Sequence, residues 1–67
     1  MGDAPLLLTQ EQVAALLQVS PRTLEDWRLR GGGPPYVKPS RRCVRYARAA
    51  IEAWIAGNTF ANTAQAA

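Results

Sequence analysis

The chain has 67 residues, with eight Lys or Arg, five Asp or Glu, one Cys, no His and a net charge of +3 at pH 7. This length has room for one small domain of modest stability. With Cys43 alone and no His, the chain has no Cys/His cluster for zinc, no internal disulfide and no Ser-His or Cys-His nucleophile pair. We therefore expect a protein that is not an enzyme and needs no metal or cofactor. The apolar run Leu6 to Leu8 follows Asp3 rather than a basic residue, so we expect no signal peptide, no membrane span and a cytoplasmic location.

The first expected helix begins at Thr9 or Gln10. Thr9 is placed as an N-cap with Gln12 three residues on, and Leu8 before the cap can pack on Val13 as a hydrophobic staple. The residues expected on its buried face are Val13, Ala14, Leu16 and Leu17. The pattern ends near Gln18.

A second helix is predicted over residues 21–30, after a turn of only two or three residues. Ser20 is its N-cap, a Pro follows at the favoured first helical position, and Val19 faces Leu24 as a second staple. Leu24 and Trp27 are expected to be buried, and the Gly and Pro residues that follow cannot continue the helix. Two helices joined by so short a turn must cross at a steep angle.

A β-hairpin is predicted next, from the β-favouring runs at residues 36–38 and 43–46. Residues 39–42 between them, Pro-Ser-Arg-Arg, are expected to form the loop, with Arg41 and Arg42 at its tip. Alternation places Val37, Val44 and Tyr46 on the buried face and Lys38 and Arg45 on the other face. A hairpin alone is marginal in water, so it must lean on the helices.

The third helix is expected over residues 47–56. It buries Ile51, Trp54 and Ile55 and has Gly57 as its C-cap. Ala47 supplies no capping side chain at its start. The expected organisation is a flexible N-terminus (1–6), one folded domain (7–57) and a disordered, Ala-rich tail (58–67).

The positive charge is concentrated in one band of the chain. Residues 22–48 contain all eight basic side chains and only two acids, Glu25 and Asp26, which gives this band a charge of +6. Such a concentration is typical of a protein that neutralises phosphates, although a solvated surface would also explain it. The basic residues are Arg22, Arg28, Arg30, Lys38, Arg41, Arg42, Arg45 and Arg48.

Residues 10–29 resemble the helix-turn-helix pattern of DNA-binding proteins, and residues 7–56 as a whole resemble the small winged helix-turn-helix of excisionase and AlpA-like regulators in the MerR-like superfamily. The matching stretches are Leu8-Thr9-x-Glu11-x-Val13-Ala14-x-Leu16-Leu17-x-Val19-Ser20-x-Arg22-Thr23-Leu24-x-x-Trp27-Arg28, then Gly33-Pro34-Pro35-Tyr36-Val37-Lys38, Val44-Arg45-Tyr46 and Ile51-Glu52-Ala53-Trp54-Ile55. The resemblance implies a mainly α fold with a small β-hairpin, in the order helix, helix, two-stranded wing, helix.

The chain departs from the family pattern in two respects. Gln18 stands where many helix-turn-helix sequences have Gly in a left-handed conformation, at a cost of about 1 kcal/mol or with a slightly different turn. Ala47, Ala49 and Ala50 replace the polar and basic residues expected at the start of the third helix, which weakens any claim that this helix end touches DNA.

In helix-turn-helix proteins the second helix enters the major groove with its N-terminal half. Arg22 is our first choice for a base contact with guanine, and an ion pair with Asp26 is the alternative. Ser20 and Thr23 are placed to bind phosphate at the helix N-terminus, where Ser20 also has the N-cap role.

The remaining candidate contacts lie further along this helix and on the wing. Glu25 and Asp26 can accept from cytosine or simply balance the charge of Arg28 and Arg30 one turn on, and Arg28 is expected to meet the DNA backbone. The wing tip is expected to reach the minor groove or its phosphates. The full set of expected DNA-binding residues is Ser20, Arg22, Thr23, Glu25, Asp26, Arg28, Lys38, Ser40, Arg41, Arg42 and Arg45. Trp27, Trp54 and Tyr46 are expected in the core rather than as base-stacking platforms.

The function that the resemblance implies is sequence-specific binding of double-stranded DNA, as an excisionase (recombination directionality factor) that binds repeated sites and bends DNA beside a tyrosine or serine integrase. A small transcriptional regulator is the alternative, and a protein-interaction adaptor with the same fold is a further one. No heptad or long apolar face marks a dimer, so we expect a monomer that associates head to tail on DNA. Phe60 is the residue of the tail that could serve this contact, and disorder of the tail is the alternative.

Overall fold

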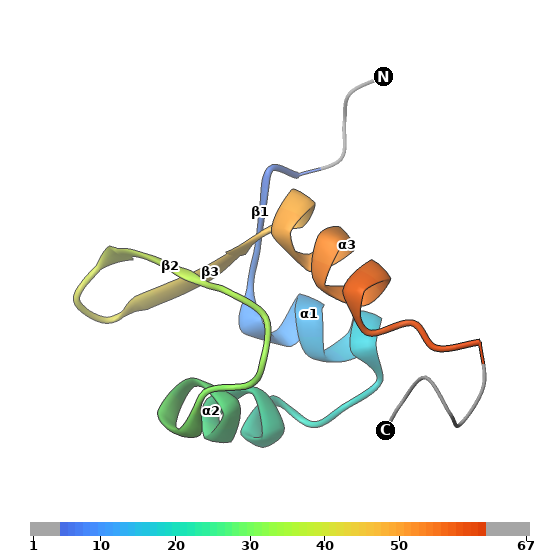
Figure 1. The fold of residues 1–67 in the computed structure, drawn as a ribbon. Coiled ribbons are helices and arrows are strands. Elements are labelled where there is room, and N and C mark those ends of the chain that lie inside the picture. The colour runs from blue at the N-terminus through green and yellow to red at the C-terminus, as the bar shows by residue number, and fades with distance from the viewer. Residues whose placement is uncertain (1–4, 62–67) are drawn as a thin grey trace.

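The computed structural model describes residues 5–61 as three helices and three short strands (Figure 1). The elements are β1 (Leu7–Leu8), α1 (Gln10–Leu17), α2 (Pro21–Arg30), β2 (Val37–Ser40), β3 (Cys43–Ala47) and α3 (Arg48–Gly57). The expected order of helix, helix, two-stranded wing and helix is confirmed, and β1 is an addition that the sequence did not predict. Residues 1–4 and 62–67, which belong to the expected N-terminal segment and tail, lie outside the described residues.

The predicted capping box of α1 is present. The Gln12 amide nitrogen donates to Thr9 Oγ1 at 3.1 Å, and the Thr9 amide nitrogen donates to Gln12 Oε1 at 2.9 Å. At the other end, Gln18 is left-handed (φ 59°, ψ 43°), while the Val19 amide donates to the Ala14 carbonyl at 3.0 Å. This is the Schellman arrangement, in which the left-handed residue is usually Gly. Gln18 therefore adopts the left-handed conformation that carries the expected backbone strain.

The second helix, α2, also begins and ends as predicted. Ser20 Oγ accepts from the Thr23 amide at 3.1 Å, and the helix stops where the Gly31 amide donates to the Trp27 carbonyl at 2.6 Å. Gly31 and Gly32 have φ of 84° and 97°, which L side chains rarely adopt. The chain then folds back over α2 so closely that a Cβ on Gly33 would lie 2.7 Å from Trp27 Cβ.

The three strands form one antiparallel sheet in the order β1-β3-β2. Leu8 pairs with Tyr46 at the base of β3, while Val37 and Ser40 pair with Arg45 and Cys43 nearer the tip. Three steps along β2 therefore match two along β3, so β2 contains a bulge. Pro39 lies in the bulged stretch, on an edge strand where a missing N–H is tolerated.

This register corrects two expectations for the hairpin. The turn is only Arg41–Arg42, because Pro39 and Ser40 belong to β2 rather than to a four-residue loop. Val37 was expected on the buried face, and that is wrong: it pairs with Arg45 and is 41% exposed. Residues paired across antiparallel strands share a face, so Val37 lies on the Arg45 side rather than with Val44 and Tyr46.

The core lies where α1, α2, α3 and the base of β3 meet. Its buried residues are Leu8, Val13, Ala14, Leu24, Tyr46 and Ile51, with Leu17, Val19, Trp27 and Val44 packed against them. Leu16, expected in the core, is 57% exposed. On a helix it lies on the far side of Val13 from Ala14 and Leu17.

The third helix, α3, differs from the sequence expectation at its C-terminal end. Ala47 is the N-cap and makes no side-chain capping bond, as expected, but Gly57 is still helical and Asn58 is the C-cap. Ile55 is 44% exposed instead of buried, because the last turn of α3 extends past the sheet (Figure 1). Ile51 and Trp54 carry the packing, and the Trp54 ring lies 5.7 Å from that of Trp27.

Candidate DNA-binding surface

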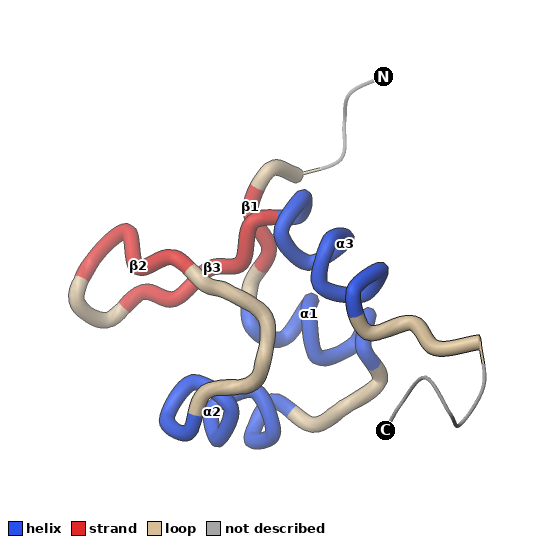
Figure 2. Tube along the Cα trace, viewed as in Figure 1, coloured by secondary structure: helices blue, strands red, loops and turns tan. Residues whose placement is uncertain are grey.

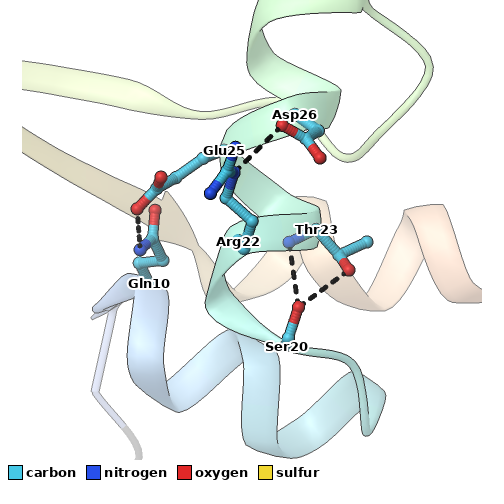
Figure 3. Close-up of polar contacts among 6 residues, drawn as sticks. All are labelled: Gln10, Ser20, Arg22, Thr23, Glu25 and Asp26. Carbon is cyan, nitrogen blue, oxygen red and sulfur yellow. Dashed lines mark hydrogen bonds and ion pairs between the residues drawn. The ribbon is translucent and has the colours of Figure 1, made fainter.

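The N-terminal end of α2 is ordered by Ser20 (Figure 3). Its hydroxyl accepts the Thr23 amide hydrogen and lies 3.0 Å from Thr23 Oγ1. The N-cap role weighed for Ser20 is therefore present. The two hydroxyls lie together at the positive end of the helix dipole, Ser20 on the residue before α2 and Thr23 in the first turn of the helix.

Arg22 and Asp26 form the i, i+4 ion pair that was the alternative to a base contact. The distance from Arg22 Nε to Asp26 Oδ1 is 3.5 Å, and the two side chains are 80% and 39% exposed. An ion pair this long and this exposed contributes little to stability. Arg22 therefore projects from α2 into solvent and can exchange Asp26 for another partner at small cost.

Glu25 is held by the first helix rather than by its own. Gln10 Nε2, in the first turn of α1, donates to Glu25 Oε2 at 3.2 Å, as Figure 3 shows. Of the expected neighbours one turn on, neither Arg28 with Glu25 nor Arg30 with Asp26 forms an ion pair within residues 5–61. The sequence could not reveal the Gln10 contact, because it depends on the crossing of α1 and α2.

Arg28 faces the protein interior. Its Nη1 donates to the Tyr46 hydroxyl at 2.7 Å, and its guanidinium carbon lies 5.8 Å from the centre of the Tyr36 ring. It was expected to meet the DNA backbone, but in this structure its side chain is half-buried and already bonded. No signal in the sequence distinguishes it from the exposed Arg22 and Arg30 on the same helix.

The wing presents most of its expected contacts to solvent. Lys38 and Ser40 of β2 and the turn residues Arg41 and Arg42 are exposed. Arg45 is half-buried, and its Nη1 donates to the Val44 carbonyl at 2.8 Å. The positively charged tip of the wing is therefore the turn Arg41–Arg42, and Lys38 adds a further charge on the edge strand β2.

The recognition helix and the wing lie on one side of the molecule. In Figures 1 and 2, α2 and the β2–β3 hairpin both extend to the left of α1 and α3. The structure thus brings together two separate groups of candidate residues, one at the start of α2 and one at the hairpin tip. Both groups carry exposed Arg side chains, and both belong to the basic band of residues 22–48.

One exposed residue of this surface was not included among the expected DNA-binding residues. Leu29 is 85% exposed on the last turn of α2. It follows Arg22 and Asp26 at helical spacing, so it belongs to the same face of α2. The spacing from Arg22 was the signal that could have identified it. Of the aromatic residues expected in the core, Tyr46 is 1% exposed there and Trp27 packs against the core from α2, whereas Trp54 is half-buried and lies beside Trp27.

Two properties of the described part bear on other classes of function. Within residues 5–61, no helix has the length and apolar character needed to cross a membrane. In the same stretch, no three His, Cys, Asp or Glu side chains gather into a group that could hold a metal ion.

A protein-family model described as a helix-turn-helix domain matches residues 7–59. No curated protein matches the chain. The family match covers most of the 67 residues and includes both helices of the motif, the wing and α3. The chain therefore belongs to the helix-turn-helix family of small excisionase and AlpA-like DNA-binding domains, and its fold is a winged helix-turn-helix.

Proposed function

We propose that this protein binds specific double-stranded DNA sites as an excisionase, a recombination directionality factor that bends the DNA beside an integrase. The observation that carries the DNA-binding part is the placement of exposed Arg side chains on two separate elements that lie on one side of the molecule: Arg22 on α2, and Arg41 and Arg42 on the wing. Two such elements can contact one duplex at two places.

The start of α2 enters the major groove in this proposal. Arg22 is exposed and weakly paired, so it can make the bidentate contact to guanine that is the commonest specific pairing. Ser20 and Thr23 approach a phosphate at the helix N-terminus. Asp26 and Glu25 line the same helix face, and a carboxylate there can accept from the cytosine amino group.

The wing reaches the minor groove or its flanking phosphates with Arg41 and Arg42, and Lys38 and Ser40 follow along the backbone. Neutralising phosphates on one side of a duplex while holding it at two points favours bending toward the protein. Repeated sites would then be occupied by several copies arranged head to tail. Phe60, which is 49% exposed just beyond α3, is a residue available for that contact.

The excisionase role within the family rests on the resemblance over residues 7–56, and a small transcriptional regulator would use the same surface. A tyrosine or serine recombinase is the partner that an excisionase requires. The two roles differ in where the sites lie: an excisionase protects repeats beside an integrase attachment site, and a regulator protects a promoter.

The first test is a titration of the protein into random and genomic duplex fragments at two salt concentrations. Neutralising about five phosphates predicts a slope of log K against log salt concentration near −4 to −5. Failure to bind any duplex at low salt would contradict DNA binding and favour a protein-interaction adaptor of the same fold. Footprinting on flanking genomic DNA then separates excision from transcriptional control, and a circular-permutation gel assay measures the bend.

A further inference from the structure

One arginine of α2 joins three parts of the fold. Arg28 donates to the hydroxyl of Tyr46 on β3 at 2.7 Å and lies over the ring of Tyr36, which precedes β2, at 5.8 Å from its centre. The two tyrosine rings are themselves 6.3 Å apart. A single guanidinium therefore connects α2 to strand β3 and to the residue that leads into β2, at the base of the wing.

The partner of Arg28 cannot itself touch DNA. Tyr46 is 1% exposed, and within the described residues no buried side-chain polar atom lacks a hydrogen-bond partner. Arg28 supplies the bond that satisfies the Tyr46 hydroxyl. A charged donor on a buried hydroxyl is stronger than a neutral one, and a stacked guanidinium adds to it.

The link matters because, apart from the loop that packs Gly33 on Trp27, the wing makes few direct contacts with α2. The base of β3 packs mainly against β1, α1 and α3, while α2 packs mainly against α1. The Arg28 side chain thus spans the recognition helix and the wing directly, without passing through α1.

We propose that Arg28 is a positioning residue that fixes the wing relative to the recognition helix, instead of contacting the DNA backbone. The inference rests on the proposed function. It adds an explanation of how α2 and the wing, the two elements proposed to contact DNA, are kept at a fixed distance from each other. Fixing this spacing in the free protein reduces the ordering that the wing must undergo on binding.

The first experiment needs no DNA. Backbone ¹⁵N relaxation is measured on the wild-type protein, Arg28→Met, Tyr46→Phe and the matched control Arg30→Met, which removes a charge from the same helix turn. Both Arg28→Met and Tyr46→Phe should lower the order parameters of residues 38–42 and leave those of α1 unchanged, while Arg30→Met changes neither. Unchanged wing order in both variants overturns the proposal.

The second experiment measures duplex affinity for the same variants in two backgrounds, the parent and a wing variant carrying Arg41→Ala and Arg42→Ala. In the parent background, Arg28→Met and Tyr46→Phe should each weaken binding about tenfold, the size expected for one lost charge-assisted hydrogen bond. In the wing variant, which has lost the two arginines at the tip and keeps only the contacts of Lys38 and Ser40, the effect of either change should fall below about twofold. All titrations are run well below the melting temperature found by circular dichroism.

The possible outcomes separate the explanations. If Arg28→Met weakens the parent and the wing variant equally, Arg28 contacts DNA itself or acts only through stability, and the proposal is wrong. If Arg28→Met does not fold, Tyr46→Phe decides by the same comparison, since it keeps the ring and removes only the hydroxyl. If the wild type binds no duplex, the proposed function fails, whereas the relaxation data still decide whether Arg28 holds the wing.

Discussion

Arg22 and Asp26 lie one turn apart on α2, with Arg22 Nε 3.5 Å from Asp26 Oδ1. This separation exceeds that of a strong charge-assisted hydrogen bond, and Arg22 is 80% exposed. The ion pair and the proposed base contact are therefore compatible. Asp26 binds Arg22 only weakly in the free protein, so a guanine can replace Asp26 as the partner of the Arg22 guanidinium.

Replacing Arg22 should remove site discrimination. Arg22→Ala is expected to lose about 1 to 3 kcal/mol of preference for the specific site over random duplex, because a bidentate base contact is gone. Asp26→Asn is the matched control, since it removes the ion pair, keeps the guanidinium and retains an amide oxygen that can still accept from a cytosine amino group, so specific affinity should stay within about twofold of wild type. Competition titrations with specific and random duplexes measure both. Equal losses in the two variants would mean that Arg22 acts through Asp26 and reads no base.

The wing tip should contribute affinity without specificity. Arg42→Ala is expected to weaken specific and random duplexes alike and to flatten the salt slope by about one unit, as for one lost phosphate contact. Arg48→Ala is the comparison, because this arginine starts α3 and pairs with Glu52 at 3.2 Å. Its salt slope should stay at the wild-type value. A slope unchanged in Arg42→Ala would remove the wing tip from the interface.

The left-handed turn residue should limit stability. Gln18 has φ 59°, so Gln18→Gly is expected to raise the free energy of unfolding by up to about 1 kcal/mol and the melting temperature by about 4–8 °C. Gln18→Ala keeps the same backbone strain and should change stability by less than about 0.5 kcal/mol. Thermal unfolding followed by circular dichroism gives both values. A destabilised Gly variant would show that the Gln18 side chain matters more than its backbone.

Two glycines should respond to Ala in opposite directions. A Cβ on Gly33 would meet Trp27 Cβ at 2.7 Å and its ring at 2.8 Å, so Gly33→Ala should cost about 1–3 kcal/mol. Gly57 is helical with nothing within 4 Å of its added Cβ, so Gly57→Ala should stabilise by about 0.5 kcal/mol. Urea denaturation measures the pair. A Gly33→Ala variant as stable as the wild type would contradict the packing of the Gly loop on Trp27.

The parts of the fold that the sequence predicted well are those governed by neighbours in the chain. Thr9 with Gln12, and Ser20 with its following Pro, fix helix starts through contacts three residues apart, and both caps are present. Gln18 was placed at the left-handed turn by its position in the motif.

The errors concern relationships between elements. Val37 was assigned to the buried face by alternation within its own strand, but the bulge in β2 decides which β3 residue it faces. The Gln10–Glu25 and Arg28–Tyr46 contacts join residues 15 and 18 positions apart, so they follow from helix crossing and wing packing, which no local pattern encodes. Strand β1 has only two residues, too few for a period to be visible.

Strand β3 is divided between two tasks along its length. Its outer residues, from Cys43 to Arg45, pair with β2, whereas Tyr46 and Ala47 pair with β1. The end of β3 that lies opposite the hairpin tip is thus held by pairing with β1, the segment before α1. We therefore expect a change at Leu7–Leu8 to alter the mobility of the hairpin tip in addition to the effect of Arg28, although this pairing lies at the opposite end of β3 from the arginines of the turn.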